Sequence, residues 1–287
     1  MKRNTAKVAG LALTMIFQRC ASADVPLSPT GDGHLSIPVT LNGQGPFDFT
    51  IDTAAQRPMI APPLARKLHI EPTGNSKFHG SSGTQSAEFA QVADFRSGLF
   101  DRQHESVVIV PPGGAVSVGV VGMDSFLDKR IELDFSHMTA SVGSSSTAPA
   151  GFTAIPAVVR SGTMVIVDVT VNGHPAKALI DSGARRTIGN PALEAALGYQ
   201  NGDPSLAVAD AVGGATGDKV PASKGELKTI VMGPATFDKP LVTFADLPVF
   251  APLGLADTPA LILGLDQLAH LKAMAIDFPR AEFQIKR

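Results

Sequence analysis

The chain has 287 residues, of which 44% are hydrophobic and 17% charged, so it can bury one large core or two ordinary domain cores. Its 28 glycines and 22 prolines, with no tryptophan and one tyrosine, favour short strands and many turns over long helices. The formal net charge of −2 excludes a strongly basic protein of the kind that binds nucleic acid through its phosphates.

The start of the chain predicts a signal peptide, residues 1–23. Residues 1–7 carry three basic side chains, and residues 8–17 form an apolar run too short to span a bilayer. Residues 21–23 read Ala-Ser-Ala, a small-residue cleavage pattern. An uncleaved membrane anchor is the alternative, and a lipoprotein site at Cys20 is disfavoured by the arginine before it. We therefore expect a periplasmic or secreted protein.

Cleavage after Ala23 would change the charge and the available chemistry. It removes four basic and no acidic residues, so the net charge falls from −2 to about −6. A chain of that sign has no electrostatic reason to bind nucleic acid or an anionic membrane. Cys20 is the only cysteine, so the processed chain would have no disulfide, no thiolate metal site and no cysteine nucleophile.

Two segments of the chain then repeat the same order of elements. In each, a predicted strand reaches an Asn-Gly hairpin signal, and a second strand delivers an aspartate to a loop of small residues. A short helix follows, then a variable middle part and a turn of two apolar residues and glycine. The matching pairs are Asn42-Gly43 with Asn172-Gly173, Ile51-Asp52-Thr53-Ala54-Ala55 with Ile180-Asp181-Ser182-Gly183-Ala184, and Val121-Gly122 with Leu263-Gly264.

Helix signals occupy matching places in the two segments. Asn190 is predicted to cap a helix that begins at Pro191 and ends at Gly198. Asp124 and Asp266 stand just before short apolar stretches, and we interpret both as helix N-caps and not as catalytic acids. Those stretches are Ser125–Leu127 and Gln267–Ala273.

The repeat defines the expected domains. The first lobe covers residues 24–142 and the second covers residues 155–287. Residues 143–154 between them are mostly small and polar, which is typical of a linker.

The two aspartate loops, each after an apolar strand, resemble the Asp-Thr/Ser-Gly loops of aspartic peptidases. The later turns at Gly122 and Gly264 resemble the psi-turns of the retropepsin-like half-barrel. The resemblance covers nearly all of the chain after residue 23. It implies an all-β protein of two tandem retropepsin-like (pepsin-type acid protease) β-barrel lobes, with pseudo-twofold symmetry, short helices and six mostly antiparallel strands in each lobe.

The resemblance also implies roles for the loop residues. Thr53 and Ser182 would each bond across the interface to the opposite loop. Ala54 departs from the family pattern, which has glycine there; we expect some strain, because glycine permits φ values that are costly for other residues. Ala55 and Ala184 stand where pepsin-like enzymes resemble one another in having a hydroxyl, so the aspartates are expected to keep a shared proton to higher pH.

The chemistry of such a site needs two carboxyl groups. One takes a proton from water while the other gives a proton to the carbonyl oxygen, and two adjacent aspartates share one proton because both cannot ionise. The resemblance assigns these roles to Asp52 and Asp181 of an aspartic endopeptidase that needs no metal and no other cofactor. Its partner would be a peptide or protein in extended form, bound partly by main-chain hydrogen bonds, and the protein would be a monomer.

Other interpretations stay open at this point. The same fold could be a catalytically inactive peptide-binding protein, which Ala54 would favour, or an exported β-rich structural protein with accidental loops. The glycines of two further segments (Gly80, Gly83, Gly213 and Gly214) belong either to mobile flaps over a cleft or to ordinary surface turns. The Arg185–Arg186 pair is interpreted as a solvated or salt-bridged face. The chain lacks the nucleophile elbow, P-loop and His-Glu-x-x-His patterns.

Overall fold

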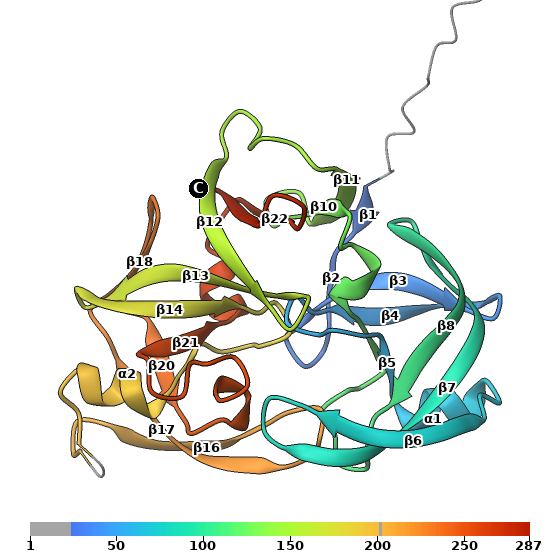
Figure 1. The fold of residues 1–287 in the computed structure, drawn as a ribbon, viewed down its shortest axis with the longest axis horizontal. Helices are drawn as coiled ribbons and strands as arrows, with labels where there is room; N and C mark the ends of the chain where they lie inside the picture. Colours follow the sequence, from blue (N-terminus) through green and yellow to red (C-terminus); the bar gives the residue numbers. More distant parts are fainter. Residues whose placement is uncertain (1–23, 201–202) are drawn as a thin grey trace, which may run out of the picture.

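Short β-branched and apolar runs between Asn-Gly and Gly-rich turns give this chain a regular structure that is mainly strand, with only short helices. The computed structural model describes residues 24–200 and 203–287, so the predicted signal peptide lies outside the described residues. Figure 1 shows two β lobes side by side, with a further layer of strands across the top of their junction. None of the helices in the described ranges has the length and apolar character needed to cross a membrane.

The first lobe is a closed barrel. Its strands follow the order β2-β3-β4-β9-β5-β8-β7-β6, and β3 also pairs with β7, which closes a ring of six strands as expected. The elements are β2 (Ser28–Pro29), β3 (Leu35–Leu41), β4 (Gln44–Ile51), β5 (Met59–Ile60), α1 (Pro62–Lys67), β6 (Pro72–His79), β7 (Thr84–Ser97), β8 (Phe100–Ile109), β9 (Gly119–Val121) and the 3-10 helix η1 (Met123–Ser125).

The second lobe repeats this arrangement with shorter pieces. Its order is β12-β13-β14-β21-β15-β20-β17-β16, and β18 pairs with β13 as β7 pairs with β3 in the first lobe. The elements are β12 (Thr153–Arg160), β13 (Met164–Val171), β14 (His174–Ile180), β15 (Ile188–Gly189), α2 (Pro191–Ala196), β16 (Ala207–Gly213), β17 (Lys219–Glu226), β18 (Thr229–Met232), β19 (Ala235–Asp238), β20 (Leu241–Phe244), η2 (Pro248–Phe250), β21 (Ala260–Leu263) and α3 (Leu265–Leu268).

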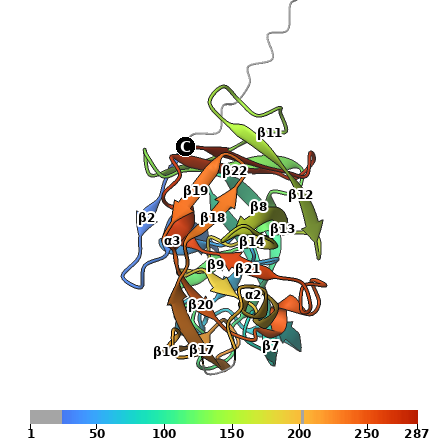
Figure 2. The ribbon, with the colours of Figure 1, turned by 90° about the vertical axis from the view of Figure 1, so that its left-hand side faces the viewer.

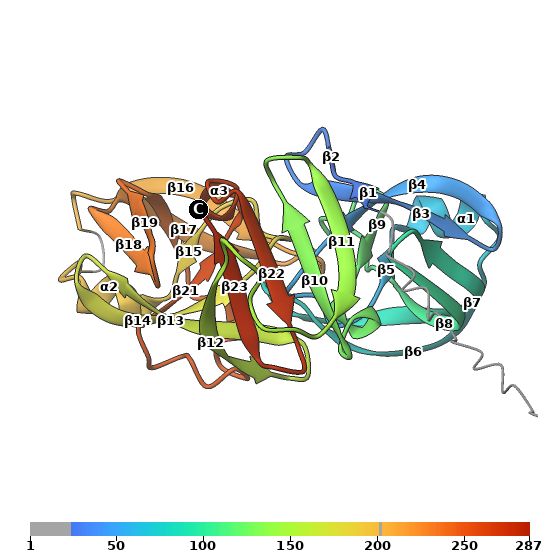
Figure 3. The ribbon, with the colours of Figure 1, turned by 90° about the horizontal axis from the view of Figure 1, so that it is seen from above.

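A layer of six strands joins the lobes, and Figure 3 shows it from above. The order is β1-β11-β10-β22-β23-β12, so each lobe supplies an antiparallel hairpin, and the two hairpins pair along β10 and β22. Glu132 pairs with Ala275 at the middle of that contact. This layer consists of β1 (Val25–Pro26), β10 (Lys129–Asp134), β11 (Thr139–Ser144), β22 (Ala273–Asp277) and β23 (Glu282–Lys286), together with β12.

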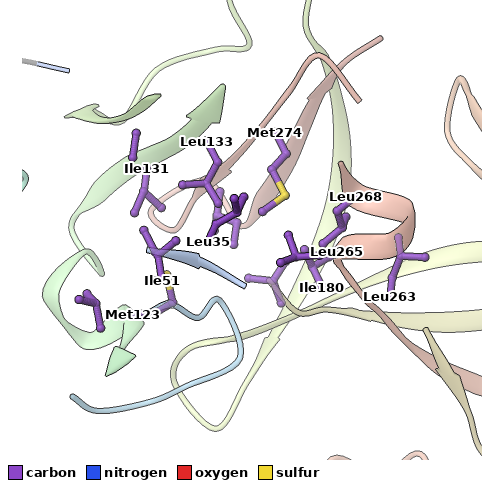
Figure 4. Packing of buried hydrophobic residues seen from close by; sticks show 14 of the residues in the cluster. Leu35, Ile51, Met123, Ile131, Leu133, Ile180, Leu263, Leu265, Leu268 and Met274 are labelled. Carbon is purple, nitrogen blue, oxygen red and sulfur yellow. The ribbon is translucent and has the colours of Figure 1, made fainter. Parts of the chain in front are cut away.

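The hydrophobic core continues through the junction of the lobes. Ile51 and Ile180, the residues before the two aspartates, are fully buried in the same cluster as Leu133 and Met274 of the joining layer. Figure 4 shows these side chains in one cluster, with Leu133 and Met274 drawn above Ile51 and Ile180. Because both aspartate loops rest on this packed core, their positions relative to each other are fixed by burial.

The helix predictions were partly right. Asn190 caps α2, since its side chain accepts a hydrogen bond from Leu193 N at 2.8 Å, and Pro191 opens the helix. The N-cap interpretation of Asp124 and Asp266 is wrong, because both lie in the first turn, after the N-caps Gly122 and Gly264. Because glycine has no side-chain oxygen, neither helix start has a side-chain cap.

Candidate active site

Each lobe presents its aspartate through the same strand geometry. β4 runs parallel to β9, and β14 runs parallel to β21. Asp52 N donates to Val121 O at 3.2 Å, and Asp181 N donates to Leu263 O at 3.1 Å. The two loops therefore leave their barrels at equivalent points and meet at the junction of the lobes.

The hydroxyl residues of the two loops hold the lobes together. Thr53 Oγ1 donates to Ile180 O at 2.9 Å, and Ser182 Oγ donates to Ile51 O at 2.7 Å. In return, the backbone N–H of each residue donates to the other hydroxyl, at 3.1 Å for Thr53 N and 2.9 Å for Ser182 N. Both side chains are buried, so these four reciprocal bonds are shielded from water. This is the contact that the resemblance implied for Thr53 and Ser182.

Each aspartate is oriented by its own loop. Asp52 Oδ1 accepts hydrogen bonds from Ala54 N at 2.8 Å and Ala55 N at 2.9 Å. Asp181 Oδ1 accepts equivalent bonds from Gly183 N and Ala184 N, also at 2.8 and 2.9 Å. The two carboxyl groups lie close enough for each to act on the pKa of the other, and Asp52 and Asp181 are hereafter called the aspartate pair.

The departure at Ala54 does not strain the loop. Neither Ala54 nor Gly183 has a positive φ, so the expectation of a costly backbone conformation was wrong. Gly183 is needed for space, because an added Cβ would lie 2.2 Å from Asp52 Cγ. The methyl group of Ala54 packs instead against an apolar cluster of the second lobe that includes Leu179 and Ile262. The two loops therefore have the same hydrogen bonds but unequal steric room.

The glycines of the psi-turns support the loops from behind. A Cβ on Gly122 would lie 2.6 Å from the backbone N of Arg57, and one on Gly264 would lie 2.7 Å from the carbonyl oxygen of Arg186. Such a close approach of two backbones requires glycine. Beside these turns, Met123 N donates to Ala55 O at 2.9 Å and Leu265 N donates to Ala184 O at 2.8 Å.

The environment of the aspartate pair favours the protonated form. Burial raises the pKa of Asp52, against the two loop N–H groups and the charge of His34, which lower it. Burial raises the pKa of Asp181 well above its ordinary value, and the charge of Asp52 adds to the rise. Both carboxyls are therefore harder to ionise than an ordinary aspartate, and the pair titrates as one unit.

The glycines predicted to form flaps lie at or beside the tips of two β-hairpins. Gly80 and Gly83 are in the tip between β6 and β7, while Gly213 ends β16 and Gly214 begins the tip before β17. In Figures 1 and 2 these hairpins run along the bottom of the molecule, on the side opposite the joining layer.

The two hairpin tips contact each other. The hydroxyls of Ser82 and Thr216 are 3.2 Å apart and buried, and Gln85 Nε2 donates to Asp218 Oδ1 at 2.9 Å. The hairpins thus form a continuous bridge between the lobes.

Two side chains beside the aspartate loops cross between the lobes, a role that the sequence had not indicated. Gln56 Nε2 donates to Ser161 O at 3.0 Å, and Arg185 Nη1 donates to Asp32 O at 3.0 Å. Gln56 and Arg185 are 129 residues apart in the chain, and so are Asp32 and Ser161. The same interval of 129 residues separates Thr53 from Ser182. That interval was the available signal, since it places Gln56 and Arg185 at matching points after the two aspartates.

Asp124 and Asp266 have different surroundings. Asp266 accepts hydrogen bonds from Thr187 N at 3.1 Å and Thr187 Oγ1 at 2.7 Å. Asp124 Oδ1 is buried without a hydrogen-bond partner in the described part of the chain. Within residues 24–200 and 203–287, no group of three His, Cys, Asp or Glu side chains is placed to hold a metal ion.

Two β lobes that each bring an aspartate to their junction on matched, interlocked loops define the bilobal aspartic protease class of fold. A sequence profile of the family described as Aspartyl protease matches residues 37–125 and 167–267, once in each lobe, and the chain belongs to this family. The two matches and the repeated topology confirm the duplicated, retropepsin-like fold that was expected from the sequence.

Other comparisons add little detail. A retropepsin-like aspartic protease from Rickettsia conorii is similar in structure over 48% of this chain and 92% of its own, with 18% sequence identity and a TM-score of 0.34. Comparison with curated proteins gave no significant match.

Proposed function

We propose that this chain is an aspartic endopeptidase in which Asp52 and Asp181 activate a water molecule for attack on a peptide bond. The observation that carries the proposal is the aspartate pair itself, two carboxyls oriented by matched loops, with the pKa of Asp181 raised well above its ordinary value. Membership of the aspartyl protease family supports a peptidase, and the N–H bonds by which each loop orients its aspartate support activity.

The proposed reaction uses the shared proton twice. The ionised carboxyl accepts a proton from water as the water oxygen bonds to the peptide carbon, and the protonated carboxyl gives its proton to the carbonyl oxygen. The resulting tetrahedral intermediate then breaks its C–N bond, returns the hydroxyl proton to one carboxyl, and takes a proton from the other onto the leaving nitrogen. The aspartate pair ends with one proton, as it began.

The raised pKa of Asp181 sets the direction of the pH dependence. Activity should appear as the first carboxyl ionises and disappear as the second ionises, which gives a bell-shaped kcat/KM profile. Since burial and the Asp52 charge raise the pKa of Asp181, the descending limb should lie well above the ordinary pKa of an aspartate. Activity is therefore expected at mildly acidic pH and to continue towards neutrality.

The test is digestion of an unstructured protein by residues 24–287 across pH, with new termini identified by mass spectrometry. Asp181→Asn is the control for a contaminating protease, and it should give no cleavage. Absence of wild-type cleavage at every pH would contradict the proposal.

The alternative, a catalytically inactive peptide-binding protein, predicts binding without cleavage. A statine-type transition-state mimic would then raise the unfolding temperature of a wild-type chain that cleaves nothing.

We also propose that the chain acts outside the cytoplasm, as a monomer, on extended peptide segments. The basic start, short apolar run and small-residue site of residues 1–23 support export.

A further inference from the structure

A pocket of about 300 Å³ is built by both lobes at the end of the second aspartate loop. The first lobe supplies the turn of Asp32 and His34 and the segment 114–117. The second lobe supplies Arg185, in the chain directly after Ala184, whose N–H orients Asp181. Because the charge of His34 acts on the Asp52 carboxyl, the pocket is within electrostatic range of the aspartate pair.

One wall of the pocket also contacts the tip of the β16–β17 hairpin. Ala115 N donates to Gly214 O at 3.1 Å, so the wall formed by residues 114–117 touches the tip between β16 and β17. A peptide lying between the hairpins and the aspartate pair would therefore pass its side chains over this pocket.

Both carboxylate oxygens of Asp32 in the pocket are already occupied. Asp32 Oδ1 accepts from the Thr30 hydroxyl and is 3.0 Å from His34 Nδ1, and Asp32 Oδ2 accepts from Ser117 Oγ at 2.7 Å. These bonds hold the pKa of Asp32 far below its ordinary value, chiefly through the Thr30 hydroxyl. The carboxylate is thus a fixed part of the wall.

The donor groups are not all occupied. Arg185 lays its stem against Gly33, with Cδ 3.5 Å from the place a Cβ would take, and donates from Nη1 to Asp32 O. No carboxylate within residues 24–200 and 203–287 comes within ion-pair distance of its guanidinium, which is exposed. A guanidinium has five N–H donors, so four remain for a ligand, and His34 adds a donor when protonated.

The pseudo-twofold provides an internal comparison. At the equivalent place Gln56 replaces Arg185 and Ser161 replaces Asp32, and the Gln56 bond to Ser161 O has the same 3.0 Å length. The turn of Ser161, Gly162 and Thr163 has neither a carboxylate nor an imidazole. Of these two equivalent places, one is therefore charged and the other is neutral.

We propose that Arg185 makes this pocket a subsite for an acidic side chain of the peptide, on one side of the bond to be cleaved only. The proposal rests on the proposed peptide-binding function and adds the substrate preference. The earlier interpretation of Arg185–Arg186 as a solvated face would then hold for Arg186 alone.

The test measures binding, so that it does not depend on turnover. Statine-containing peptides with Glu or Gln at each of three positions on either side of the statine are titrated into the wild-type chain by calorimetry. At one position the Glu peptide should bind roughly two- to fivefold tighter than the Gln peptide, the size of an exposed ion pair. The corresponding position on the other side should show no such preference.

Three variants locate the effect. Arg185→Gln should remove the preference, while Arg186→Gln, the same change one residue further, should keep it. Gln56→Arg should create a second preference for Glu on the opposite side. Equal binding of Glu and Gln peptides to the wild-type chain, tighter binding of a Lys peptide, or no binding of any of these peptides would overturn the proposal. Hydrolysis by the wild-type chain, measured separately, reports on the proposed function alone.

Discussion

The residues around the aspartate pair differ between the lobes more in steric room than in hydrogen bonding. Both loops donate two N–H groups to an aspartate oxygen at 2.8 and 2.9 Å. Only the second loop has the glycine against which the opposite carboxyl lies. The resulting asymmetry explains how one lobe tolerates Ala54 while the other requires Gly183.

A pair of exchanged substitutions tests this asymmetry. Gly183→Ala should lower kcat/KM roughly 10²-fold or more, because its Cβ would displace the Asp52 carboxyl by an ångström or more. Ala54→Gly should leave kcat/KM within a few-fold and lower the free energy of unfolding by about 0.5–1 kcal/mol. Peptide hydrolysis and urea unfolding measure the two effects. A large loss of turnover in Ala54→Gly, with Gly183→Ala unaffected, would reverse the account.

Asp124 gives a second prediction at this scale. Burial, with the charge of Glu105, raises its pKa from 3.8 to about 6. Because the ionised form is disfavoured in the folded state, the stability that the neutral form contributes is complete below about pH 4 and is lost as the pH rises through about 6.

Asp124→Asn should therefore be more stable than the wild type at pH 7 by about 1 kcal/mol, a value kept small because the side chain retains contact with solvent. Chemical unfolding of both chains at pH 4 and pH 7 measures the difference, which should shrink at pH 4. Asp128→Asn, at an exposed carboxylate in the same segment, is the matched control. A variant that is less stable than the wild type at pH 7 would contradict the stated cause.

At the scale of elements, the sequence predicted what depends on local chemistry. The Asn-Gly turns, the strands before each aspartate and the cap of α2 at Asn190 follow from propensities that act over a few residues. The N-cap interpretation of Asp124 and Asp266 failed because the helix start depends on the Gly122 and Gly264 turns packing against the opposite backbone, which is a tertiary contact.

The contacts between lobes were harder to predict. The hydroxyl exchange of Thr53 and Ser182 was expected only through the family resemblance. The pocket of Asp32, His34 and Arg185 brings together residues far apart in the sequence. The contact between hairpin tips depends on how the two barrels are placed, and no local pattern encodes that placement.

The hairpin contact gives a prediction for these elements. A Cβ on Gly83 would lie 2.0 Å from Asp218 Oδ2, an oxygen that is buried with no hydrogen-bond partner in the described chain. Gly83→Ala should therefore separate the hairpin tips and increase amide hydrogen exchange in segments 80–85 and 214–218 several-fold. Gly74→Ala in β6 is the control, since its Cβ would meet nothing within 4 Å. Equal exchange in both variants would show that the tips are not held by this contact.

At the scale of the whole molecule, duplication supplies what a single lobe lacks. One barrel carries one aspartate, and the joining layer and shared core fix the second lobe so that the carboxyls meet. The same duplication lets the lobes diverge, so that Gln56 and Arg185 make equivalent bonds with side chains of different charge.

Export is the prediction that concerns the chain as a whole. Protein recovered from the periplasm or medium of an expressing bacterium should begin at Asp24, as read by N-terminal sequencing. Changing Ala21 and Ala23 to Leu should block this cleavage, because the site needs small residues. Soluble cytoplasmic protein with an intact Met1 would exclude export.

The central claim is that Asp52 and Asp181 act as one unit, and the most direct measurement is kcat/KM for a cleaved peptide in four chains. Asp52→Asn and Asp181→Asn should each lose roughly 10³-fold or more, and the double variant should lose no more than either single one. Asp48→Asn, the same change at an exposed site on β4, should keep wild-type activity. Near-normal turnover in either single variant, with its fold intact by circular dichroism, would contradict the account.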